Sequence, residues 1–89
     1  MKSLEILVTG KVQDVWYRKY TCDKARELGV QGTVQNLDTG QVLIRATGTE
    51  NQVKELEEWC WTGSPESSVK NVETKAIESK PFSGFDIID

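Results

Sequence analysis

The sequence contains no histidine. This absence excludes a Ser-His-Asp or Cys-His nucleophilic mechanism within the chain, and it removes the usual proton shuttle and a common zinc ligand. Cysteine is nearly as scarce. Cys22 and Cys60 do not form a CxxC motif, so a zinc ribbon and a dithiol redox site are excluded. We expect both to be small buried hydrophobic side chains, although two cysteines would also suffice for one disulfide.

An excess of positive charge and a long apolar run are also missing. Eleven basic residues against fourteen acidic ones give a net charge of -3, whereas binding along a nucleic-acid backbone needs a basic surface. No apolar stretch approaches the ~18 residues of a membrane span, and Glu5 lies where a signal peptide would be apolar. We therefore expect a cytoplasmic monomer that binds neither nucleic acid nor membrane.

The chain has the size and composition of one folded domain over residues 1–89. A length of 89 residues leaves room for a single domain. With 37% hydrophobic and 28% charged residues, the composition is typical of a soluble globular protein rather than a disordered one.

The first half of the chain predicts a strand, a helix and a hairpin. Alternating apolar residues over 4–8 indicate a strand that ends at Gly10. A helix over 18–28 is expected, with Tyr17, Thr21, Ala25 and Leu28 on one face and Gly29 as its stop. Extended segments over 30–37 and 41–47 flank a predicted hairpin turn at 37–40.

The second half predicts another helix and two strands. Thr49 and Gln52 form a capping box, and the run Gly63-Ser64-Pro65 ends the helix that it starts. Residues 69–77 are rich in strand-forming residues with mixed alternation, which suggests a bulge. A short final strand includes Phe85, and Pro81 before it favours an edge position. Trp59 and Trp61 are expected to pack near the helix end, although an exposed tryptophan can also stack on a ligand.

The order β-α-β-β-α-β plus a short C-terminal strand is the split βαβ pattern of the ferredoxin-like fold. It predicts an α+β sandwich, an antiparallel sheet with both helices on one face. Many functions occur on this fold, so the fold alone does not identify the activity.

The segment between the first strand and the first helix is the most informative for function. A strand–loop–helix junction exposes backbone N–H groups at the helix start, where an anion can bind. Arg18 lies in the first helical turn, where its charge opposes the helix dipole unless an anion is bound. Arginine also suits two-point binding of a phosphoryl group. The alternative is that Arg18 is an ordinary solvated residue.

The run Gly10-Lys11-Val12-Gln13-Asp14-Val15-Trp16-Tyr17-Arg18 resembles the acylphosphatase signature, glycine-x-valine-glutamine-glycine-valine-x-phenylalanine-arginine. Gly32-Thr33-Val34-Gln35-Asn36 resembles the family's second strand, and the likeness spans nearly the whole chain. The resemblance implies hydrolysis of a carboxyl–phosphate bond on a ferredoxin-like fold. It also implies two key residues, Arg18 and Asn36. The loop that would bind the phosphoryl group comprises Val12, Gln13, Asp14, Val15, Trp16 and Tyr17.

The chemistry of an acyl phosphate suits a chain without histidine. Its leaving group is a carboxylate with a conjugate-acid pKa near ~4, which departs without protonation. The transition state of phosphoryl transfer is loose, so positioning and charge stabilisation carry most of the catalysis. Arg18 and the loop amides would hold the phosphoryl oxygens, and Asn36 would orient the attacking water. No metal or organic cofactor is required. The alternative for Asn36 is a turn-favouring residue beside the hairpin.

Asp14 departs from the pattern, because it stands where the family has glycine. Glycine there allows a backbone angle that other residues adopt poorly, and Asp14 adds negative charge to an anion site. Its carboxylate could also cap the helix on the N–H groups of Trp16 or Tyr17. An alternative function is therefore an anion-binding module with weak or no turnover. A regulatory or RNA-binding domain is less favoured, because no basic, aromatic-rich strand face is evident.

Overall fold

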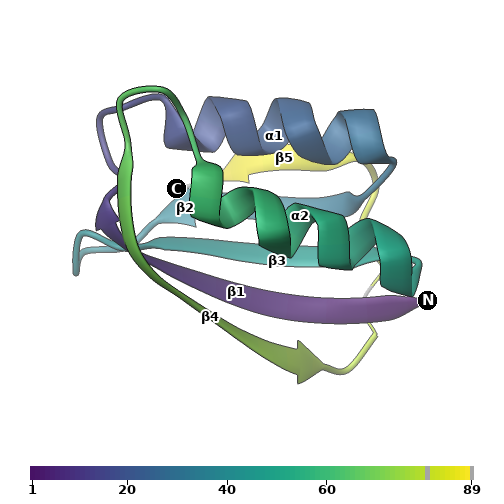
Figure 1. Cartoon of the computed structure of the whole chain (residues 1–89). Coiled ribbons are helices and arrows are strands. Elements are labelled where there is room, and N and C mark those ends of the chain that lie inside the picture. Colours follow the sequence, from purple (N-terminus) through teal and green to yellow (C-terminus); the bar gives the residue numbers. More distant parts are fainter. Residues whose placement is uncertain (80, 89) are drawn as a thin grey trace.

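The computed structural model describes residues 1–79 and 81–88, which form a five-stranded sheet with two helices on one face (Figure 1). The order of strands is β4-β1-β3-β2-β5, which confirms the predicted ferredoxin-like α+β class. The strands are β1 (Lys2–Lys11), β2 (Gln31–Asn36), β3 (Val42–Gly48), β4 (Ser68–Ile77) and β5 (Phe85–Ile88), and the helices are α1 (Tyr17–Leu28) and α2 (Glu50–Thr62).

The prediction of an antiparallel sheet is wrong for one strand pair. β1 pairs antiparallel with β3 and β4, and β2 with β3, but β5 pairs parallel with β2. The pairing directions place the end of β4 and the start of β2 at the same end of the sheet. A chain that crosses there to the far edge can only run parallel to β2. β5 is an edge strand, as Pro81 suggested.

β1 continues through Gly10 to Lys11, contrary to the prediction that Gly10 ends it. The register between β1 and β4 shifts at Thr9/Gly10, which leaves Lys70 as the extra residue of a β-bulge. This confirms the bulge predicted in β4. Gly10 has a φ of 136°, and a Cβ atom there would collide with the backbone of Ser68. Glycine therefore lets the strand pass the bulge rather than stopping it.

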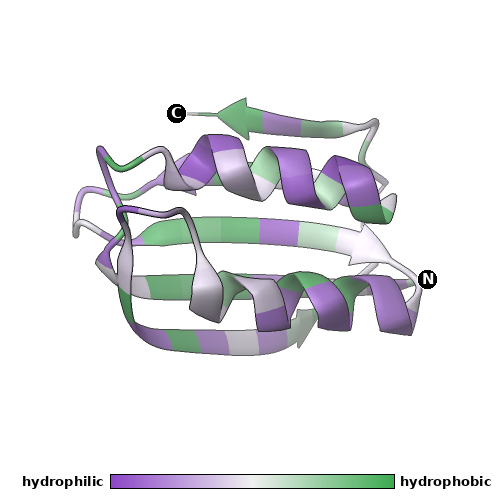
Figure 2. Cartoon of the chain, turned by 45° about the horizontal axis from the view of Figure 1, so that its top comes forward, coloured by the Kyte–Doolittle hydropathy of each residue, from purple (hydrophilic) through white to green (hydrophobic). Residues whose placement is uncertain are grey.

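The core lies between the sheet and the helices, and the alternating apolar residues of β1 and the predicted face of α1 contribute to it (Figure 2). Leu28 is half-buried against this core, and Trp59 packs beside it as expected. Trp61 does not, since 52% of it is exposed. The buried residues on the inner faces of the strands and helices include Leu4, Ile6, Val8, Tyr17, Thr21, Ala25, Val42, Ile44, Ala46, Val53, Leu56 and Cys60.

Three of the four helix boundaries have their expected caps. The Thr49 side chain accepts a hydrogen bond from the Gln52 N–H, and the Gln52 side chain accepts one from the Thr49 N–H. Gly29 ends α1 in a left-handed conformation. Gly63 ends α2, and its N–H donates to the Trp59 carbonyl. Neither helix of the described residues is long and apolar enough to cross a membrane.

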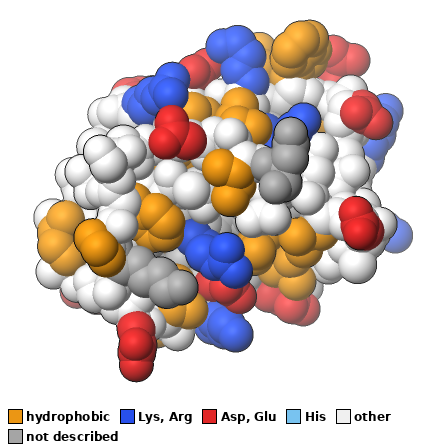
Figure 3. Space-filling model, turned by 180° about the vertical axis from the view of Figure 1, so that it is seen from behind, with side chains coloured by type: hydrophobic (Ala, Val, Ile, Leu, Met, Phe, Trp, Pro, Cys, Tyr) orange, Lys and Arg blue, Asp and Glu red, His pale blue; other side chains and the backbone are white. Residues whose placement is uncertain are grey.

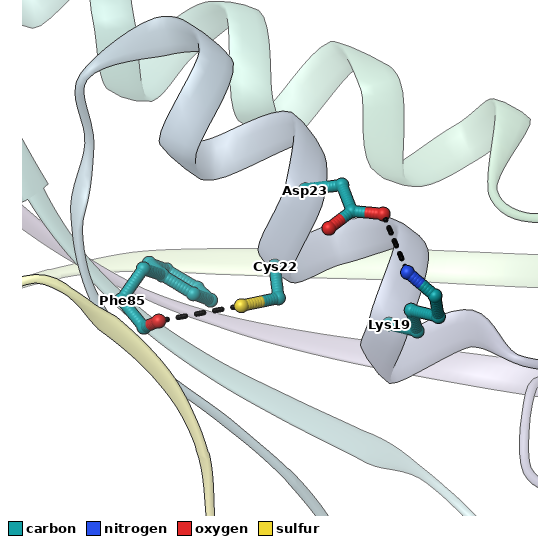
Figure 4. A network of polar contacts seen from close by, with 4 residues as sticks. All are labelled: Lys19, Cys22, Asp23 and Phe85. Atoms are coloured by element: carbon teal, nitrogen blue, oxygen red, sulfur yellow. Dashed lines mark hydrogen bonds and ion pairs between the residues drawn. The ribbon is translucent and has the colours of Figure 1, made fainter.

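The two cysteines are buried free thiols, as expected. Burial raises the pKa of Cys60 to about 12. The Cys22 thiol donates to the Phe85 carbonyl at 3.3 Å (Figure 4), and Arg26 Nη2 donates to the same oxygen at 3.0 Å. These contacts fasten β5 to α1. Lys19 and Asp23 form an ion pair one helical turn apart on the exposed side of α1.

Gly32→Ala is expected to destabilise the domain by about 3 kcal/mol or more. Gly32 has a φ of 151°, and an added Cβ would collide with the Arg45 carbonyl on β3, which cannot yield without breaking the sheet. The matched control is Gly40→Ala. Gly40 has a φ of 90° but open space around it, so only the backbone strain of about 1 kcal/mol applies. The free energy of unfolding of each variant is measured in urea. An equal loss of stability in Gly32→Ala and Gly40→Ala would contradict the expected collision.

Candidate functional site

Three segments meet at one end of the molecule: the β1–α1 loop (residues 12–16), the β2–β3 hairpin (37–41) and the segment after α2 (63–67) (Figure 1). The Gln13 amide joins the first two. Its Nε2 donates to the carbonyls of Leu37 and Gln41, each at 2.8 Å. Both hydrogens of the amide are therefore used on the hairpin, so Gln13 holds the loop in place rather than facing a ligand.

The segment after α2 supports the loop from the other side. The buried Ser64 hydroxyl donates to the Val15 carbonyl at 2.6 Å. The Tyr17 hydroxyl donates to the Cys60 carbonyl at 2.7 Å, and the Tyr17 ring packs on Trp59 with centroids 5.6 Å apart. Burial raises the pKa of Tyr17 well above its usual range, so its hydroxyl keeps the proton that it donates. Val15 is itself buried.

The loop backbone has the shape of an anion-binding junction. Asp14 and Trp16 both have a φ of 63°, in the left-handed region, and left-handed residues in a tight turn direct successive N–H groups to one side. The N–H groups of residues 14–17 donate to no residue that the structure describes. The first helical bond runs from the Tyr20 N–H to the Trp16 carbonyl. Free N–H groups at a helix start attract anions.

The left-handed backbone at Asp14 confirms the expectation that this position suits glycine. The predicted cap is wrong. Trp16, not Asp14, is the N-cap of α1, and no side chain caps the helix there. A side-chain cap usually comes from a residue with an extended backbone, whereas the backbone of Asp14 is left-handed, which accounts for the difference. The exposed Asp14 carboxylate has no hydrogen-bond partner within residues 1–79 and 81–88.

A cleft of about 500 Å³ opens beside this loop. Arg18 lies in it, half-buried, and its charge makes the cleft suited to an anion. Lys19 also borders the cleft, but its ammonium lies 3.1 Å from the Asp23 carboxylate. The described residues that line the cleft are Val12, Asp14, Trp16, Tyr17, Arg18, Lys19 and Ile87.

Asn36 is the last residue of β2, on the strand face that also carries buried Val34 and Gly32. Its Oδ1 atom is buried and has no hydrogen-bond partner among the described residues. A buried acceptor left unpaired costs about 1–3 kcal/mol, so its persistence points to a polar ligand or water. Asn36 is not among the described lining residues of the Arg18 cleft. Its chain neighbour Leu37, however, is hydrogen-bonded to Gln13 of the loop.

The structure divides the predicted loop into two groups. Val12, Asp14, Trp16 and Tyr17 line the cleft beside Arg18, whereas Gln13 and Val15 support it from behind. Sequence reasoning assigned no supporting role to Ser64, because nothing near it in the sequence indicates a bond to Val15. It also missed Ile87. The position of Ile87 depends on the parallel pairing of β5, which the residue pattern did not indicate.

The fold and the loop define a small ferredoxin-like domain whose β1–α1 junction has N–H groups that donate to none of the described residues. The acylphosphatase family profile matches residues 4–87. An acylphosphatase of Haloquadratum walsbyi is 48% identical over 92% of this chain and 88% of its own length. An acylphosphatase of Shewanella amazonensis is 47% identical over 89% of this chain and 87% of its own length. The crystal structure of acylphosphatase from Bacillus subtilis covers both chains completely, with a TM-score of 0.96 and 32% identity. The chain belongs to the acylphosphatase family.

Gln13→Ala is expected to lower the free energy of unfolding by about 1–3 kcal/mol, because two partly buried carbonyls lose their donor. Hydrolysis of acyl phosphate should also fall, since the loop loses its attachment to the hairpin. Gln13→Glu is the shape-matched control. It keeps the volume but removes both donors, so it should be at least as destabilising. Urea unfolding measures the change in stability, and steady-state kinetics measure the change in hydrolysis. Full stability of both variants would contradict the role of Gln13 in holding the loop against the hairpin.

Proposed function

We propose that this chain hydrolyses the carboxyl–phosphate bond of acyl phosphates, with Arg18 and the loop amides binding the phosphoryl group and Asn36 orienting the attacking water. The reaction follows from membership of the acylphosphatase family. The residue roles are supported above all by one observation: the backbone N–H groups beside Arg18 have no acceptor among the described residues.

Phosphoryl binding combines charge with geometry. The guanidinium of Arg18 presents several donors in one plane, which match the oxygens of a phosphoryl group. The N–H groups of residues 14–17 add neutral donors at the positive end of the α1 dipole. Because the loop is fixed by Gln13 and Ser64 before substrate arrives, these donors need little reorganisation when charge redistributes in the transition state.

Cleavage of the carboxyl–phosphate bond then needs a water molecule as the nucleophile and no general acid. The water oxygen attacks phosphorus, and the bond from phosphorus to the carboxylate oxygen breaks. The carboxylate leaves without taking a proton, and the water proton passes to the phosphate or to solvent. The Asn36 Oδ1 atom, buried and unpaired, suits the role of accepting a hydrogen bond from that water. An oriented water is a large part of the entropic advantage of an enzyme.

A second candidate function is anion binding with weak turnover, which the presence of Asp14 in place of the family's glycine suggests. Its carboxylate borders the same cleft as Arg18. A negative charge there opposes the phosphoryl group through Coulomb repulsion. The two candidates share the binding site and differ only in rate.

We further propose that the domain acts as a cytoplasmic monomer on a small-molecule substrate, without nucleic acid or membrane. Seen from behind, basic and acidic side chains are interspersed, and hydrophobic side chains form several separate groups (Figure 3). The exposed edge strand β4 carries a bulge at Lys70 and a second lysine, Lys75, which discourage pairing with another sheet. Two free buried thiols suit a reducing compartment.

We expect Arg18→Ala and Asn36→Ala to change different kinetic parameters. Arg18→Ala should lower kcat/KM for acetyl phosphate by about 10³-fold and weaken binding of inorganic phosphate. Asn36→Ala should lower kcat by about 10²–10³-fold and leave phosphate affinity within a few fold, because water positioning acts on the transition state. Steady-state kinetics and phosphate titration separate the two.

Two controls accompany these variants. Arg18→Lys keeps the charge but loses the planar fork, so it should recover only part of the rate. Asn71→Ala removes an exposed asparagine of β4, far along the chain from the loop, and should leave kinetics intact. More than a tenth of the normal rate in Arg18→Ala would overturn its role. A collapse of phosphate binding in Asn36→Ala at undiminished kcat would make Asn36 a substrate ligand instead.

Asp14→Gly is expected to tighten phosphate binding and raise kcat/KM, chiefly through KM. The exposed charge contributes about 1 kcal/mol of repulsion, or roughly fivefold in affinity, at low salt, and less at high salt. Asp14→Asn is the matched control, since asparagine tolerates the left-handed backbone but carries no charge. Phosphate titration at two salt concentrations separates charge from backbone effects. Equal affinity in all three proteins would mean that Asp14 does not influence the site.

A further inference from the structure

The cleft beside Arg18 has an apolar wall that phosphoryl binding does not use. Trp16 is 68% exposed and Ile87 is 45% exposed, and both line the cleft. Large apolar side chains left open to water at a cleft are characteristic of ligand sites. Trp16 lies two residues before Arg18, and both line the same cleft as Ile87, so this wall adjoins the place proposed for the phosphoryl group.

The fold brings the two halves of the wall together from opposite ends of the chain. The carbonyl of Phe85 is hydrogen-bonded to Cys22 and Arg26 in the body of α1. Phe85 is buried, and Ile87 follows two residues later on the same face of β5. As β5 runs on, Ile87 reaches the first turn of α1, where Arg18 and Lys19 lie.

The charges around the wall select against acidic groups. Asp14 borders the cleft with an exposed carboxylate. The nearby Lys19 ammonium is paired with Asp23 at 3.1 Å, so it offsets Asp14 only in part. An acyl group that carries a second carboxylate would meet the repulsion of Asp14 without a free lysine to compensate.

We propose that Trp16 and Ile87 form the acyl-binding subsite of this enzyme and select uncharged apolar acyl groups, aromatic ones above all. The proposal rests on the function proposed above, because Arg18 must hold the phosphoryl group for the acyl group to lie here. An aromatic acyl group stacks on the indole of Trp16 and covers the Ile87 side chain. A small acyl group such as acetyl leaves both exposed to water.

Two measurements test the subsite, one of them independent of turnover. The first compares kcat/KM for benzoyl phosphate and acetyl phosphate. The second compares the dissociation constants of benzoylphosphonate and acetylphosphonate, whose carbon–phosphorus bond is not hydrolysed, by calorimetric titration. We expect the wild-type chain to prefer the benzoyl compound by about tenfold in both.

The variants are Trp16→Ala, Trp16→Phe and Ile87→Ser. Trp16→Ala should reduce the benzoyl preference by about three- to tenfold, mainly through KM, and Ile87→Ser should reduce it by a smaller factor. Trp16→Phe should restore most of the preference, because phenylalanine keeps an aromatic face. The matched control is Trp61→Ala. Trp61 is also an exposed tryptophan, on α2. It lies outside the described cleft lining, so its loss should leave the preference unchanged.

The outcomes separate the subsite from the activity. Hydrolysis with equal preference in wild type and Trp16→Ala overturns the subsite and leaves the proposed function intact. A benzoylphosphonate preference that depends on Trp16, without hydrolysis of either substrate, supports the subsite and overturns the proposed activity. A wild-type preference for the acetyl compounds, or the same loss in Trp61→Ala as in Trp16→Ala, also overturns the subsite.

Discussion

The site depends on a loop that is fixed by its carbonyl groups while its N–H groups stay unpaired. The Ser64 hydroxyl bonds to the carbonyl of Val15, and the Gln13 amide uses its two donors on hairpin carbonyls. Side-chain donors thereby satisfy backbone carbonyls. Among the described residues, no acceptor takes a hydrogen bond from the N–H groups of residues 14–17. Two non-glycine residues in left-handed conformations cost about 1–2 kcal/mol each. The surrounding bonds offset this strain and hold the loop in the conformation that the proposed anion site requires.

Local patterns in the sequence predicted most of the fold because those patterns have local causes. The capping box at Thr49 and the stop at Gly29 act within a single turn of helix. The alternation in β1 and β3 follows from one buried and one exposed sheet face. The direction of β5 has no local cause. It depends on where β4 ends relative to the far edge of the sheet, which only the assembled topology decides. The prediction that Gly10 ends β1 failed for a similar reason. Glycine is needed there because of the bulge on the neighbouring strand β4.

The same division applies to the site. The sequence proposes Arg18 from its place at a helix start and Asn36 from its spacing in the family motif, and their roles stay predictions. Gln13 also matched the motif, but its amide faces two carbonyls that lie more than twenty residues away in the chain. Ser64 reaches Val15 over a still longer separation. Contacts of this kind leave no periodic or compositional signal in one sequence. A motif therefore identified the residues of the loop without distinguishing those that line the cleft from those that support it.

At the proposed site, we expect Asp14 to weaken binding of the phosphoryl group more than it slows catalysis, because of the charge of the substrate. The phosphoryl group is anionic in the ground state and remains so in a loose transition state. Repulsion from a fixed carboxylate therefore raises both states by similar amounts, which weakens binding and leaves the barrier from the bound complex nearly unchanged. A large loss of kcat would require Asp14 to occupy the donors that the transition state uses. Its carboxylate bonds to none of the described loop amides, and the helix N-cap is Trp16 instead. If the proposed site is correct, this geometry predicts an enzyme with reduced affinity for anions, its product phosphate included, rather than a module that binds without turnover.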